Sequence, residues 1–201
     1  SNPSVSLFVL TSMNIAGTLD LTGDHGYVFL VRGAVEISGA ISMEANRRTP
    51  GPGGATGGAS STDGDGPYPG ATEREAGGGG GARLGNGGHG GGSTSNGGNG
   101  SLACSVAALN DIWSRSILGG SSGAGGQYMH GGMTNGGGGG GFLQIYSATS
   151  VDLAATSAFD ARGGDGVSST GTLVGAAGGG GSGGVIIVEA PMMSMSGPAL
   201  H

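Results

Sequence analysis

The chain has 201 residues, of which 52 are glycine and 35% are hydrophobic, and its 13 acidic and 7 basic residues give a net charge of −6. This length predicts one domain, residues 1–201, with a modest core. The chain has no lysine, which excludes a phosphate-binding loop of the G-x-x-x-x-G-K type and a Schiff-base lysine. Its single cysteine, Cys104, excludes an internal disulfide framework. Its negative charge disfavours nucleic-acid binding.

Four segments in chain order share one pattern, an apolar run followed by alternating apolar and polar residues. They span residues 7–21, 28–43, 142–159 and 185–199. In the second, Val35, Ile37 and Ile41 have one parity and Glu36 and Ser38 the other. A period of two over this length predicts β-strands with one buried face and one face in water.

Repetition of such segments predicts an all-β fold with layered or solenoid-like strands, in which each unit buries its face on the next. Gly17 and Gly39 interrupt the first two repeats at equivalent points, where a bend or a close backbone approach is expected. An ordinary antiparallel sandwich with coincidental similarity between its strands is the alternative.

A long glycine-rich insertion, residues 44–141, separates the second repeat from the third. Within it, residues 102–118 contain little glycine and place Leu102, Val106, Leu109 and Trp113 at helical spacing. This spacing predicts one short amphipathic helix, with an irregular apolar loop as the alternative.

The glycine tracts lie next to hydrophobic strands and are expected to be ordered. The candidate tracts are 77–81, 87–92, 97–100, 131–141 and 175–184. Extended glycine helices with three residues per turn have no internal hydrogen bonds, so their backbone groups must pair with neighbouring segments or with water. The tracts therefore predict a bundle of polyglycine II helices attached to the strands. Mobile surface loops are the competing interpretation.

At this point the chain resembles a known group. The strand 35–41 followed by glycine-rich excursions, and the entry of a glycine pair into Val185-Ile186-Ile187, are similar to glycine-rich secreted bacterial surface and fibre proteins. The tracts are also similar to the polyglycine bundle in the receptor-binding adhesins at phage long-tail-fibre tips. The resemblance implies an extracellular, non-catalytic scaffold for attachment or assembly.

No motif in the sequence predicts a catalytic, cofactor or metal site. The four histidines have no acid or nucleophile at catalytic spacing. The Asp-Gly turns at 63–66 and 163–166 hint at calcium but do not continue into a full set of ligands, which favours solvated turns. No apolar stretch is long enough to cross a bilayer. Tyr68, Trp113 and Tyr128 are the candidate binding residues, because loops and aromatic side chains commonly form interfaces.

These features predict a non-enzymatic extracellular or cell-surface structural protein. It is expected to form a fibre or filament by self-association through its strand edges. The alternative is an adhesin or phage tail-fibre module that presents the three aromatic residues to a cell-surface receptor or glycan. A more distant alternative is an ice-binding protein, since flat arrays of repeated backbone can order water.

Overall fold

The computed structural model describes residues 4–72, 78–82, 87–90, 98–101, 119–126, 134–167, 176–196 and 199–200. Twelve strands and no helix occur in these residues, so the all-β prediction is confirmed. The strands form four consecutive sets of three, which we call rungs. Rung 1 holds β1 (Val5–Leu10), β2 (Met13–Ile15) and β3 (Thr18–Asp20); rung 2 holds β4 (Gly26–Val31), β5 (Val35–Ile37) and β6 (Ala40–Ser42); rung 3 holds β7 (Phe142–Ser147), β8 (Ser150–Leu153) and β9 (Ala158–Asp160); rung 4 holds β10 (Val185–Glu189), β11 (Met192–Met195) and β12 (Ala199–Leu200).

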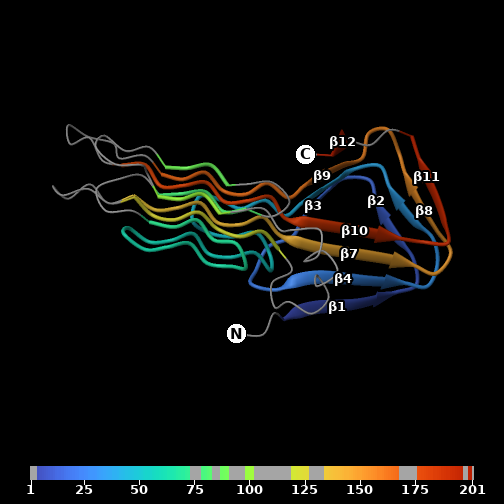
Figure 1. The fold of residues 1–201 in the computed structure, drawn as a ribbon. Helices are drawn as coiled ribbons and strands as arrows, with labels where there is room; N and C mark the ends of the chain where they lie inside the picture. Colours follow the sequence, from blue (N-terminus) through green and yellow to red (C-terminus); the bar gives the residue numbers. More distant parts are fainter. Residues whose placement is uncertain are drawn as a thin grey trace.

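Each rung contributes one strand to each of three parallel four-stranded sheets. Sheet A has the order β1-β4-β7-β10, sheet B the order β11-β8-β5-β2, and sheet C the order β12-β9-β6-β3. All nine strand pairings are parallel, so the antiparallel-sandwich alternative is wrong. Figure 1 shows sheet A as four arrows side by side, with sheets B and C behind and above it.

The core consists of apolar columns that run from rung to rung inside the three sheets. Because the pairings are in register, residues of equal parity stack on one another: Val35 pairs with Val151, and Ile41 pairs with Phe159. These side chains are buried, whereas Glu36 on the opposite face of β5 is exposed. The parity predicted from the sequence therefore separates core from surface correctly.

The corners between the sheets are stabilised by close backbone contacts and by a buried hydroxyl. Gly39 follows β5, and a Cβ on it would lie within 3.0 Å of the carbonyl oxygen of Gly17 in rung 1. At the corner after β7, the buried Ser147 hydroxyl donates to the Gly33 carbonyl (2.8 Å) and accepts from the Ser150 N–H (3.1 Å). The Gly39–Gly17 contact joins rung 2 to rung 1, and the Ser147–Gly33 hydrogen bond joins rung 3 to rung 2.

The rungs are connected where sheet C ends and sheet A begins. Residues 21–25 connect rungs 1 and 2 directly, whereas residues 43–141 and 161–184 leave the strands and return. The described parts of these two connections extend together to one side of the strand body (Figure 1). The helix predicted near 102–118 lies outside the described residues. No helix long and apolar enough to cross a membrane occurs in the part of the chain that the structure describes.

The glycine segments are extended, and they exchange backbone hydrogen bonds with a spacing of three residues. Residues 136–141 donate in turn to three different neighbours. Gly136 donates to Gly58 and Gly139 donates to Ala55, both in segment 51–58. Gly137 donates to Gly179 and Gly140 donates to Ser182, both in segment 176–184. Gly138 donates to Arg47 and Gly141 donates to Met43, and all six hydrogen bonds are 2.7–3.0 Å long. Each residue thus points about a third of a turn from the one before it.

The returning segment 176–184 has the same spacing. Gly178, Gly181 and Gly184 donate to the carbonyls of Val167, Gly164 and Ala161. Exposure follows the same period, because residues 177, 180 and 183 are exposed whereas 178, 179, 181, 182 and 184 are partly or fully buried. The glycines at the buried positions have no room for a side chain; for example, a Cβ at Gly181 would lie within 3.0 Å of the Gly138 carbonyl oxygen.

Two segments that were not among the predicted glycine tracts also belong to this array. Residues 119–126 donate to segment 134–141 through Gly120, Gly123 and Gly126, and residues 51–58 pair with both of these segments. Segment 119–126 includes Ser121 and Ser122, which are fully buried. Small polar residues are accommodated here because their hydroxyls accept hydrogen bonds from neighbouring backbone N–H groups.

Candidate assembly interface

The two ends of the stack of rungs have free strand edges. Among the described residues, β1, β2 and β3 pair on one side only, and so do β10, β11 and β12 at the other end. A free edge offers unpaired N–H and C=O groups to another strand. Because all three sheets are parallel, the two ends are not equivalent.

The rung-4 end exposes side chains that continue the buried columns. Met193 and Met195 of β11 pair in register with Val151 and Leu153 of β8. Val151 and Leu153 are 1% and 3% exposed, but Met193 and Met195 are 46% and 56% exposed. The core of sheet B is therefore open to solvent on this side.

The rung-1 end is open mainly in sheet A. The Phe8 ring stacks on the Phe29 ring with centroids 5.3 Å apart, yet Phe8 is 42% exposed. Phe8 and Phe29 are register partners, so Phe8 is the terminal member of another core column. In sheet B the terminal residues Met13 and Ile15 are buried.

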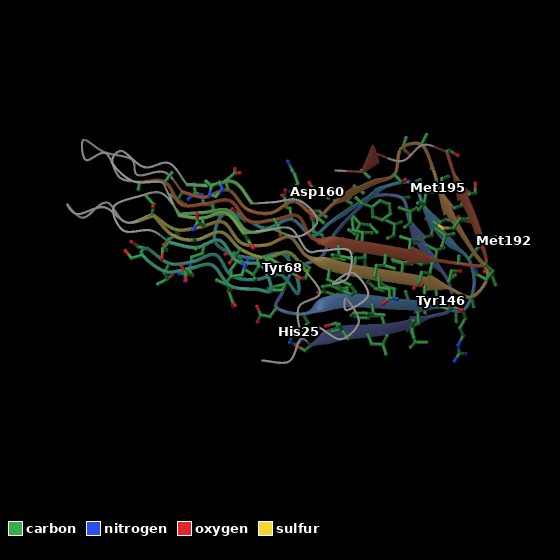
Figure 2. The ribbon with its side chains drawn as sticks, viewed as in Figure 1. His25, Tyr68, Tyr146, Asp160, Met192 and Met195 are labelled. Carbon is green, nitrogen blue, oxygen red and sulfur yellow. The ribbon has the colours of Figure 1, made fainter. Side chains whose placement is uncertain are left out.

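The outer face of sheet A is also apolar. Leu7, Val9, Leu30 and Tyr146 are exposed large hydrophobic residues, and Val9, Leu30 and Tyr146 form one register row across three rungs. In Figure 2, Tyr146, Met192 and Met195 lie on the side of the strand body away from the glycine segments. Contiguous apolar surface of this kind commonly marks an interaction site.

A charged cluster connects the two long excursions where they leave sheet C. The Arg162 guanidinium forms ion pairs with Glu44 (2.8 Å) and Asp160 (2.7 Å). The hydrogen bond that the Arg162 guanidinium donates to the Asp160 carboxylate, and then the negative charges of Asp160 and Glu44, raise the pKa of Arg162 above its already high value. Arg162 therefore stays protonated, and its ion pairs join the first residues of the excursions that begin at residues 43 and 161.

Of the three predicted binding residues, only Tyr68 lies in the described part. Its N–H donates to the Ser121 hydroxyl (3.1 Å), its C=O accepts from Ala82 (3.0 Å), and the residue is partly buried. The backbone of Tyr68 thus joins the array of glycine segments. Trp113 and Tyr128 lie outside the described residues, so the adhesin surface stays a prediction, as does ice binding.

The Asp-Gly turn at 63–66 uses its carboxylates locally. The Asp63 carboxylate accepts from the Thr72 N–H (2.6 Å) and hydroxyl (2.9 Å), and the Asp65 carboxylate accepts from the Gly66 N–H (2.7 Å). In the parts of the chain that the structure describes, no three His, Cys, Asp or Glu residues are grouped so that they could hold a metal ion.

The sequence analysis did not identify Met193 and Met195 as interface residues. No local signal distinguishes them, because Met193-Ser194-Met195 alternates in the same way as Met13-Asn14-Ile15 in the first repeat. No protein-family model, curated protein or solved structure matches this chain. The functional argument therefore depends on the geometry of the fold.

Proposed function

We propose that this chain is a non-enzymatic structural module that builds a fibre or filament at a cell surface by self-assembly through its sheet edges. In this proposal the four rungs are part of a β-solenoid, and the glycine segments are a bundle of polyglycine II helices. The single observation that carries the proposal is the open rung-4 end, where Met193 and Met195 continue buried columns into solvent.

The polyglycine II assignment is supported by the spacing of three in the hydrogen bonds of 134–141 and 176–184. A left-handed extended helix with three residues per turn directs successive N–H groups to successive neighbours. Glycine loses more backbone entropy on ordering than any other residue, so a single segment of this kind would be unstable. Mutual pairing, and the direct continuation of segments 134–141 and 176–184 into β7 and β10, supply the compensation.

Rigidity supports a structural function. The glycine segments are joined to the sheets without intervening linkers, since the Gly141 N–H donates to Met43 and the Phe142 N–H donates to Pro52 (3.0 and 2.8 Å). The three sheets share one core. A body of this kind holds its two unlike sets of strand edges, β1–β3 and β10–β12, in a fixed arrangement at opposite ends of the stack. The extracellular location is part of the proposal and rests on the resemblance to glycine-rich surface proteins.

A charge placed in the open column tests the proposal. Met195→Glu places a carboxylate at the rung-4 end, in a column that assembly would bury, and burying an unpaired charge is strongly unfavourable. Met192→Glu is the matched control, because Met192 lies on the same strand with 66% exposure but has the opposite parity, facing the side of the stack.

We expect wild type and Met192→Glu to form elongated particles in electron microscopy and in sedimentation velocity at rising concentration. The Met195→Glu variant should need at least about tenfold more protein to assemble, which corresponds to about 1.4 kcal/mol. A wild-type protein that stays monomeric at all concentrations, or equal assembly of the two variants, would contradict the proposal.

A further inference from the structure

We infer that the free edges join head to tail, so that the rung-4 end of one copy receives the rung-1 end of a second copy of this chain in parallel register. The inference rests on the proposed function, because it specifies how the copies meet. Within the molecule, rungs 1 to 4 are already joined in this manner in all three sheets. The second copy would extend each sheet by the same kind of pairing.

The charge pattern of the outer column of sheet B is compatible with this joining. Asn14, Glu36, Asp152 and Ser194 are register neighbours along this column. The two carboxylates lie in the middle rungs and the two neutral residues lie at the ends, where Asn14 donates to Glu36 (3.1 Å). Head-to-tail joining places Ser194 beside the second copy's Asn14, so no like charges meet at the new boundary.

The inner columns are also compatible with joining. Continuing the register sets Val188 beside the second copy's Phe8, Met193 beside its Met13, and Met195 beside its Ile15. All of these residues are apolar. Methionine is unbranched and flexible, which allows it to fill an irregular gap between two ends that were not formed as one chain.

If two identical ends joined, the parallel register of the sheets would not continue across the boundary. A two-fold axis across the end of the stack would reverse the strand direction, so the edge strands of the two copies would meet antiparallel. The nine pairings between the described strands are all parallel, so such a joining would not repeat any pairing of the molecule. Head-to-tail contacts that do not close on themselves generate open filaments, whereas identical ends would stop at a dimer.

The described glycine segments do not extend along the direction in which the rungs are stacked (Figure 1). The glycine segments leave the strand body at the corner between sheets C and A and extend sideways from it, as Figure 1 shows. The free edges belong to β1–β3 and β10–β12, along the direction in which the rungs are stacked. A second copy therefore approaches along the stack, while its own glycine segments lie to the side.

Cysteine crosslinking tests the orientation. The full chain is prepared with Asn14→Cys and Ser194→Cys together, and with each substitution alone, in a Cys104→Ser background. The reagent is a bismaleimide too short to span the three strand spacings, about 14 Å, that separate the two positions within one molecule. We expect the double variant to give a ladder of covalent multimers, and each single variant to give none.

A Glu36→Cys/Asp152→Cys variant is the positive control, because these residues are register partners on neighbouring strands and should crosslink within one molecule. Covalent dimers from either single variant would show that identical ends meet and would overturn the inference. If sedimentation shows assemblies but the double variant gives no ladder, head-to-tail joining is wrong while the proposed function stands. If no assembly forms at any concentration, both fail.

Discussion

Adjacent glycines of segment 176–184 should respond in opposite directions to the same substitution. A Cβ at Gly181 would lie within 3.0 Å of the Gly138 carbonyl oxygen, a backbone atom that side-chain rearrangement cannot move. A Cβ at Gly180 would have a single neighbour, the Gly164 carbonyl oxygen at 3.7 Å, which is ordinary contact. Gly183, one period later, is equally open, with the Ala161 carbonyl oxygen at 3.7 Å.

The magnitudes follow from two competing effects. Replacing glycine by alanine restricts the unfolded chain and stabilises by about 0.4–1 kcal/mol where the folded backbone tolerates it. Overpacking costs about 1–3 kcal/mol. Gly180→Ala should therefore stabilise slightly, and Gly181→Ala should destabilise by roughly 1–2 kcal/mol after the entropic gain is subtracted. For a chain of this size each kcal/mol shifts the Tm by about 2–4 °C.

Calorimetric unfolding of wild type and of the Gly180→Ala, Gly181→Ala and Gly183→Ala variants measures these shifts. We expect the Tm of Gly181→Ala to fall by roughly 2–8 °C, and the Tm values of the other two to stay level or to rise by about 1–4 °C. Equal shifts for Gly180→Ala and Gly181→Ala would refute the reasoning, because glycine segments that are not packed against one another would not distinguish the two positions.

Three further substitutions test the strand body. Phe159→Ala removes a fully buried ring from the column shared with Ile41 and should lower the free energy of unfolding by about 3–5 kcal/mol in urea titration. Ser147→Ala removes the hydroxyl that joins two rungs and should cost about 1–3 kcal/mol, with faster hydrogen exchange at the Ser150 amide; unchanged exchange there would contradict the assignment. Gly39→Ala should lower the Tm by several degrees, roughly 2–8 °C, because its Cβ has no space beside Gly17, and an unchanged Tm would count against this packing.

Much of the strand body was predictable from the sequence because its signal is local. Alternation around Val35 and Ile37 identifies both the strand and its buried face, since a strand directs successive side chains to opposite sides. Gly39 predicted a close backbone approach, and the structure has one. The repeat predicted that equivalent segments pack on one another, and the in-register pairing of Val35 with Val151 confirms this.

The candidate interface was only partly predictable. Free strand edges were expected from repeats near both ends of the chain. The difference between the two ends of the stack was not predictable, because Met13 and Met195 follow the same local pattern and yet Met13 is buried and Met195 is exposed. Both residues stand at the end of a core column, so the difference in their exposure is a property of the tertiary structure and not of the local sequence.

By itself, the sequence determined where the strands of period two lie and that glycine-rich segments alternate with them. Only the tertiary structure decided that every strand pairing is parallel, and that segment 119–126, which includes the buried Ser121, joins the glycine array. The physical reason is that backbone N–H and C=O groups are the same in every residue except proline, so they do not distinguish one partner from another. An extended segment specifies the direction of its N–H and C=O groups, but the partner that receives them is chosen by the path of the whole chain.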